Sequence, residues 1–181
     1  ANFAIGSLST TLDGQVSITD NSHTLTIAEN DTPGERIFQF QLPMAGDFTI
    51  KRVGNDIQIF QGTNPTPLAS EPFANDYSVT IVGTAGNDRL TVDLTGNADT
   101  ITDLGLTFNG MGETGVPGDS LRIIGGDQGD VTYNFTSPHD GSIVMSAFGT
   151  VNYTGLEPIT NSGAATNVVF NLPVGSAATL E

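Results

Sequence analysis

Cysteine and tryptophan are absent from this 181-residue sequence, and lysine and arginine together number only 5. Without cysteine the chain has no disulfide, no thiolate-bound zinc, no iron–sulfur cluster and no thiol nucleophile. Because 20 aspartates and glutamates give a formal charge of −15, binding to nucleic acid or to an anionic membrane would act against electrostatic repulsion. No apolar run reaches the roughly 18 residues that a transmembrane helix needs. We therefore expect neither nucleic acid as a partner nor insertion into a membrane.

The sequence has instead a recurring alternation of apolar and polar residues, with almost no helical periodicity. A period of two gives a strand one apolar and one polar face. Glycine, asparagine and aspartate lie where such strands should end. This pattern predicts an all-β fold of about a dozen short strands. The expected strands are Gln15–Ile18, Thr24–Ile27, Ile37–Leu42, Phe48–Ile50, Asp56–Phe60, Tyr77–Val82, Leu90–Leu94, Leu121–Ile124, Val131–Phe135, Ile143–Met145, Val151–Tyr153 and Val168–Leu172.

The first part of the chain, residues 1–76, is predicted to be antiparallel. Gly54-Asn55 separates two alternating runs and is typical of a tight hairpin turn. Residues 61–76 contain three prolines and little patterning, which indicates a long loop or an internal boundary. We expect residues 1–76 to pack on, or to lead into, a separate module formed by residues 77–181.

Residues 77–181 contain pairs of similar segments. Val131–Asn134 and Val151–Thr154 share one pattern twenty residues apart, and Gly83–Asn87 resembles Gly163–Asn167 eighty residues further on. A spacing of twenty residues is close to one coil of a parallel β-solenoid, in which like residues stack on adjacent coils. We therefore predict a right-handed parallel β-helix (solenoid), with the tyrosines of the first pair stacked. The alternative is a β-sandwich in which these similarities are coincidental.

A glycine-rich turn at residues 83–91 raises the question of calcium. Its sequence, Gly-Thr-Ala-Gly-Asn-Asp-Arg-Leu-Thr, resembles the G-G-x-G-x-D-x-U-x nonapeptide of RTX proteins, which implies calcium bound by the aspartate and by turn carbonyls. Calcium takes six to eight oxygen ligands, and glycine lets carbonyls converge. No second copy follows nine or eighteen residues later, and residues 125–130 match only in part. The candidate metal ligands are Asp88, Asp127 and Asp130, and the alternative is that such acids cap turns.

Catalytic groups are sparse. Asp127 and Asp130 resemble the paired carboxylates of a glycosidase or polysaccharide lyase, but the second half offers only Arg89, Arg122 and His139 as basic partners. His139 is followed closely by an aspartate and a serine, yet neighbours in sequence do not make a triad in space. We expect no catalytic residues and no enzyme activity. A polysaccharide lyase or a glycoside hydrolase is the alternative.

Several segments resemble a repeated module of very long secreted or surface proteins of planctomycete-type bacteria. The resemblance covers roughly residues 77–172, and its most specific element is the ending Tyr-Thr-Gly-Leu-Glu-Pro-Ile. It implies an extracellular location and an adhesive or structural role, and it brings no catalytic residues. The segments that carry it are Gly83–Val92, Gly105–Gly110, Gly118–Gly126, His139–Val144 and Val151–Ile159.

Together these features predict a non-catalytic module of a large extracellular or cell-surface protein, acting as a structural spacer or adhesion unit. Its expected partners are neighbouring copies of the module or other surface proteins. The alternative is a β-helix protein that binds or cleaves extracellular polysaccharide. An excess of acids would keep neighbouring copies soluble and would attract divalent cations weakly.

Overall fold

The computed structural model describes residues 36–112 and 118–175, which belong to one unit of the chain, Pro33–Glu181. These residues form strands and one short 3-10 turn at Thr95–Asn97, so the all-β class is confirmed. Two expected strands, Gln15–Ile18 and Thr24–Ile27, lie outside the described residues. The strands are β1 (Arg36–Gln41), β2 (Gly46–Val53), β3 (Asp56–Gln61), β4 (Ala69–Pro72), β5 (Tyr77–Val82), β6 (Asp88–Asp93), β7 (Leu106–Asn109), β8 (Ser120–Ile124), β9 (Asp130–Phe135), β10 (Gly141–Met145), β11 (Gly149–Thr154), β12 (Ile159–Asn161) and β13 (Asn167–Asn171).

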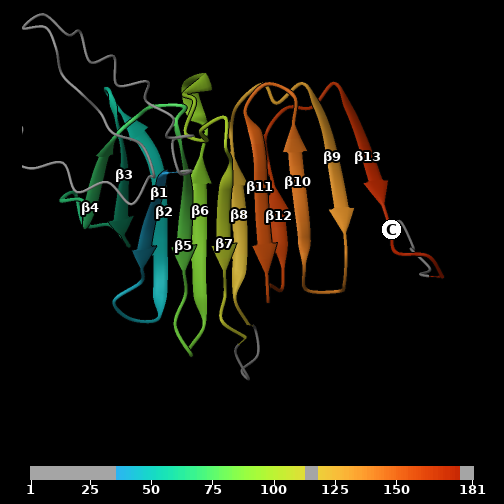
Figure 1. Ribbon diagram of the computed structural model, residues 1–181, viewed down its shortest axis with the longest axis horizontal. Coiled ribbons are helices and arrows are strands. Elements are labelled where there is room, and N and C mark those ends of the chain that lie inside the picture. Colours follow the sequence, from blue (N-terminus) through green and yellow to red (C-terminus); the bar gives the residue numbers. More distant parts are fainter. Residues whose placement is uncertain (1–35, 113–117, 176–181) are drawn as a thin grey trace, which may run out of the picture. The chain divides into compact units, whose positions relative to one another are not determined.

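The strands form two mixed sheets (Figure 1). Sheet A has 7 strands in the order β1-β5-β7-β11-β10-β9-β13, and sheet B has 6 in the order β12-β8-β6-β2-β3-β4. Most neighbouring strands are parallel. The antiparallel pairs are β2 with β3, β3 with β4, β9 with β10 and β10 with β11.

The chain passes repeatedly from sheet A to sheet B. β1 is followed by β2, β5 by β6, β7 by β8 and β11 by β12, and in each case the second strand lies in the other sheet. Each return sets the new strand parallel to the corresponding strand of an earlier passage. Two hairpins interrupt this path: β3 and β4 extend sheet B at one end, while β9 and β10 extend sheet A at the other.

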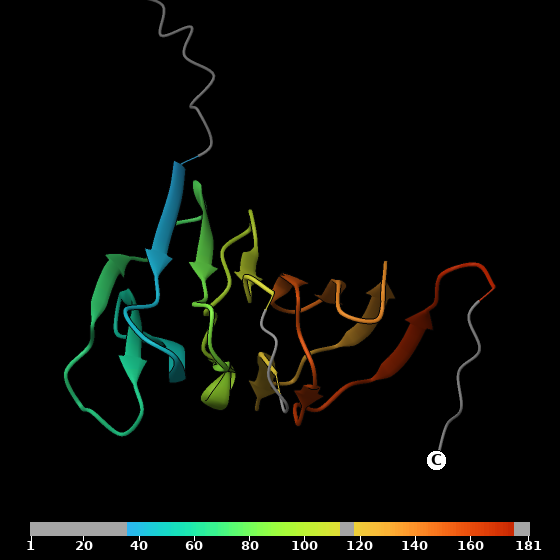
Figure 2. The same cartoon turned by 90° about the horizontal axis from the view of Figure 1, so that it is seen from below.

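The hydrophobic core lies between the two sheets, which Figure 2 shows as two layers. Because side chains alternate along a strand, every second residue of the central strands points inward. Thus Val79 on β5 and Leu106 on β7 are side by side in sheet A, while Ile50 on β2 and Val92 on β6 are side by side in sheet B. All four are fully buried. Burying such a side chain stabilises the fold by roughly 1.5–3 kcal/mol.

The two ends of this core differ, and we call them the capped end and the open end. At the capped end Arg36 on β1 forms an ion pair of 2.9 Å with Glu71 on β4, so the outermost strands of the two sheets meet. Beneath them Ile57 and Ile59 on β3 are completely buried. At the open end every residue of β13 is exposed. No other described strand is exposed at every residue.

Among the expectations about the path of the chain, one is confirmed, one is confirmed in part and one is wrong. The part expected to be antiparallel contains the antiparallel strands β2, β3 and β4, but β1 and β2 also pair in parallel with β5 and β6. Gly54-Asn55 forms the turn between the antiparallel strands β2 and β3, as predicted. The tyrosines Tyr133 and Tyr153 were expected to stack on adjacent coils, but they lie on β9 and β11, with β10 between them. The two copies of the twenty-residue repeat are therefore the first and third of three consecutive antiparallel strands, β9, β10 and β11, in one sheet. The expected boundary between residues 76 and 77 stays a prediction.

Candidate functional site

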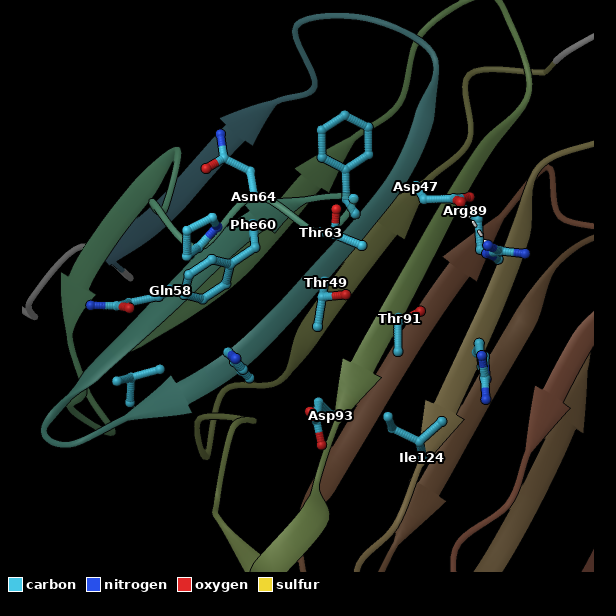
Figure 3. Close-up of a pocket in the computed structure, with 16 residues that line it drawn as sticks. Asp47, Thr49, Gln58, Phe60, Thr63, Asn64, Arg89, Thr91, Asp93 and Ile124 are labelled. Carbon is cyan, nitrogen blue, oxygen red and sulfur yellow. Dashed lines mark hydrogen bonds and ion pairs between the residues drawn. The ribbon is translucent and has the colours of Figure 1, made fainter.

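An open groove of about 760 Å³ lies on the outer face of sheet B (Figure 3). Its floor is formed by the outward side chains of β2, β3, β6 and β8, and the turn Gly62–Pro65 after β3 forms one wall. We call it the sheet-B groove. The groove exists because residues that point away from the core on four neighbouring strands share one face.

Polar side chains cross the floor of the sheet-B groove in rows. Strand register sets Thr49 on β2 beside Thr91 on β6, and Thr91 beside Arg122 on β8. Two residues further along, Lys51 lies beside Asp93. Figure 3 shows Thr49, Thr91 and Asp93 on adjacent strands of this floor. The rows place hydroxyl, guanidinium, ammonium and carboxylate groups on one accessible surface.

Three of the five basic side chains line this groove: Lys51, Arg89 and Arg122. Arg89 donates to Asp47 across 2.7 Å, and both side chains are about half exposed, so this ion pair contributes little to stability. The Lys51 ammonium lies 4.5 Å from the centre of the Phe60 ring, within the range of a cation–π contact. Arg122 forms no ion pair with any described residue. Its guanidinium is therefore available to a ligand.

The predicted metal ligand Asp88 lies in the corner between β5 and β6 and is only 1% exposed. Its carboxylate accepts hydrogen bonds from the Gly46 amide at 3.1 Å and from the amide and hydroxyl of Thr84 at 2.5 and 2.9 Å. Its own amide donates to Asp119 at 2.7 Å. Both carboxylate oxygens thus serve as acceptors inside the protein, as a turn-capping aspartate does.

Close packing at this corner requires glycine. A side chain on Gly83 would place its first carbon 3.1 Å from the Asp88 carboxylate, and one on Gly110 would place it 2.5 Å from that of Asp119. Gly83 of the nonapeptide-like turn thus admits the buried carboxylate of Asp88 beside the backbone, and Gly110 does the same for Asp119. This explains on steric grounds why the sequence resembles a calcium-binding turn.

Asp127 and Asp130 lie in other hydrogen-bond networks. Asp127 pairs with Asn97 through its amide at 2.8 Å and its carboxylate at 3.2 Å. Asp130 begins β9 and accepts from Asn167 on β13 at 2.7 Å. Asp127 follows the end of β8, whereas Asp88 begins the parallel strand β6, so these two acids lie toward opposite ends of the sheet-B strands. Within the described ranges no three acidic or histidine side chains gather in a way that could hold a metal ion, and calcium binding stays a prediction.

The run beginning at His139 forms no triad among the described residues. The His139 ring nitrogen Nδ1 lies 2.6 Å from the Glu157 carboxylate. Asp140 instead accepts from the Ser137 hydroxyl at 2.7 Å and the Gly155 amide at 2.9 Å, and these hydrogen bonds lower the pKa of its carboxyl. His23 lies outside the described residues.

A comparison with protein-family models, one with curated proteins and one with solved structures each found no match to this chain. Function must therefore be argued from its surfaces. No helix within the described residues is long and apolar enough to cross a membrane.

A second surface of interest is the open end of the core. Tyr133 and Phe135 on β9 and Phe170 on β13 form an aromatic cluster, with ring centres of Tyr133 and Phe170 5.0 Å apart and nearly parallel. The cluster borders a hollow of about 470 Å³, completed by Leu156 and Ile159 among others. Phe170 is 51% exposed. This end therefore presents an apolar surface beside a strand edge that no other described strand pairs with.

Sequence reasoning missed both surfaces. The sheet-B groove combines residues that are up to 77 positions apart, from Asp47 to Ile124, and only strand register brings them together. The open end was hidden because Val168–Leu172 reads as an ordinary strand. Its uncommon density of apolar residues, on both faces of the strand, was the available signal.

Proposed function

We propose that this chain is a non-catalytic module of a large extracellular or cell-surface protein, in which it acts as a structural spacer or adhesion unit. The observation that carries the proposal is the repeated passage of the chain between two sheets, which leaves one end of the core open. Such a unit gains stability by stacking against a neighbour rather than by enclosing a ligand.

The proposal includes a finer description of the fold. The strand pairs β1–β2, β5–β6, β7–β8 and β11–β12 are taken as four coils of a flattened, right-handed parallel solenoid. Support comes from the parallel pairing of corresponding strands in both sheets. The right hand is that of nearly all crossover connections between parallel strands. The ion pair between β1 and β4 would then join the two sheets at the first coil.

Small-angle X-ray scattering on a tandem chain tests the spacer role. Two copies joined directly, Glu181 to Ala1, should behave as one stiff rod whose longest dimension greatly exceeds that of one copy. Two globules that move independently would contradict it. Release of reducing ends or of unsaturated uronates from a panel of polysaccharides would refute the non-catalytic part.

A second candidate function, binding of extracellular polysaccharide, is favoured by the sheet-B groove alone. Its rows of hydroxyl and charged groups match the hydrogen-bonding groups of a sugar chain, and the groove opens to solvent. Isothermal titration with soluble neutral and uronate-containing polysaccharides tests this function. Thr91→Ala and Arg122→Ala should each weaken binding, whereas Arg36→Ala at the capped end should not.

A further inference from the structure

We propose that the open end of one copy binds the β1 edge of a second copy, so that sheet A continues from β13 into β1 of the neighbour. This inference rests on the proposed spacer role and names the contact through which copies associate. Among the described residues β13 pairs only with β9, and β1 pairs only with β5. These strands lie at opposite ends of sheet A. Each has one edge whose backbone groups can pair with a further strand.

The strand directions fit this contact. β13 is parallel to β9, which is parallel to β11 through the intervening antiparallel strand β10. β11, β7, β5 and β1 are all parallel. β13 therefore runs in the same direction as β1. A second copy in the same orientation would add β1 as another parallel strand, as its own β1 adds to β5.

The side chains across sheet A form columns that fix the register. One inward column ends in aromatic rings at both ends: Phe38, Val79, Leu106, Val151, Ile143, Tyr133 and Phe170. Phe170 already stacks on Tyr133 at 5.0 Å. Setting Phe38 of the second copy beside Phe170 would extend this stack by one ring.

The same register matches the outward side chains. The adjacent outward column is polar throughout: Gln39, Thr80, Thr107, Asn152, Ser142, Asn134 and Asn171. Asn171 donates to the Asn134 side chain at 2.7 Å, and Gln39 of the second copy would continue this amide ladder. On the other side of the aromatic column, Val169 would meet Ile37. These two apolar side chains point outward and are 48% and 58% exposed.

Charge also favours this edge. β13 carries no charged residue and β1 carries only Arg36, although the chain as a whole has a formal charge of −15. The contact thus brings no acidic side chains face to face, while the net negative charge of the rest of each copy repels the other copy. Association should therefore strengthen with salt, since about 0.5 M salt shortens the screening length to roughly 4 Å.

A head-to-tail contact of this kind uses two different surfaces and does not close on itself. Sedimentation velocity on the full chain should show species of two and more copies that grow with protein and salt concentration. Val169→Lys on β13 and Ile37→Lys on β1 should each give monomers. Their mixture should give dimers and nothing larger, because one intact edge of each kind remains. Val144→Lys, an outward valine in the middle of sheet A, is the matched control and should associate like the unchanged chain.

Cysteine cross-linking tests the register directly, because the chain has no cysteine of its own. Neighbouring strands lie about 4.8 Å apart, within the range of a disulfide. An Ile37→Cys chain mixed with a Val169→Cys chain should form a heterodisulfide, and Ile37→Cys with Val144→Cys should not. Asn171→Lys is a second variant of the β13 edge should Val169→Lys fail to fold, as judged by circular dichroism.

Three results would overturn this contact. The unchanged chain could stay monomeric at all salt concentrations, Ile37→Lys could still associate, or the cross-link could form only in another register. A monomeric chain whose tandem still scatters as a stiff rod would refute the edge contact and leave the spacer role intact. A flexible tandem, by contrast, would refute the spacer role.

Discussion

Replacing Asp88 by alanine is expected to lower the free energy of unfolding by about 4 kcal/mol, without any effect on ligand binding. The side chain is 1% exposed and accepts three hydrogen bonds, two of them from the backbone amides of Gly46 and Thr84. Hydrogen bonds to a charged group contribute about 1.5–3 kcal/mol each, and a buried donor left without a partner costs about 1–3 kcal/mol. The Thr84 hydroxyl can rotate to another acceptor, so the two amides set the magnitude.

Urea unfolding followed by circular dichroism measures this loss. A change of about 4 kcal/mol corresponds to a fall in melting temperature of roughly 8–16 °C for a chain of this size. Asp88→Asn keeps one acceptor oxygen and should lose about half as much. Asp47→Ala is the surface control, because its ion pair with Arg89 is exposed and should contribute less than about 1 kcal/mol.

The Asp88 variants also separate a structural role from a metal-binding role. If the carboxylate acts through its hydrogen bonds, the destabilisation by Asp88→Ala should be the same in calcium and in chelator. An equal stability of Asp88→Ala and Asp47→Ala would refute the hydrogen-bond reasoning. A destabilisation that vanishes in chelator would show instead that Asp88 stabilises the fold by binding calcium.

Of four further predictions, two concern pH, one a buried hydroxyl and one calcium. Hydrogen bonds lower the pKa of Asp140, so its ionised carboxylate stabilises the fold at pH values above the ordinary pKa of aspartate. This contribution is lost as pH falls through the lowered pKa, so the stability of Asp140→Asn in urea should fall less steeply in acid than that of the unchanged chain. Burial raises the pKa of Asp99, so stability falls as pH rises through the raised pKa, and Asp99→Asn should be more stable than the unchanged chain at neutral pH. Among the described residues the Tyr153 hydroxyl is buried without a hydrogen-bond partner, so Tyr153→Phe should raise the free energy of unfolding by about 1 kcal/mol in urea. Thermal melts in calcium and in chelator should differ by less than ~10 °C, and a larger shift would establish a specific site.

The features that sequence predicted correctly are local. Alternation along each strand identified the all-β class, and Gly54-Asn55 identified the hairpin of β2 and β3 because a tight turn has a sequence signature of its own. The pairing of β2 with β6 has no such signature, since it joins residues about forty positions apart. Register across that distance is set by packing of the whole core.

The candidate sites show the same limit. The turn around Asp88 was recognised from its glycines. Glycine makes room both for a buried carboxylate and for the carbonyls that bind a cation, and the sequence alone does not distinguish the two. The sheet-B groove was not predicted because Thr49, Thr91 and Arg122 become neighbours only through parallel pairing. The similarity of Val131–Asn134 and Val151–Thr154 was interpreted as one solenoid coil, although β10 lies between the two strands that carry it.

The stacking of strands in sheet A has a mechanical consequence. Because β1 and β13 lie at opposite ends of the sheet, a pull on the two ends of the described chain acts along the direction in which the strands are stacked. Backbone hydrogen bonds between strands point in that same direction, so tension would open one ladder at a time instead of shearing many at once. The protein would therefore yield at low force and lengthen stepwise, and it would behave as an extensible tether when stretched lengthwise.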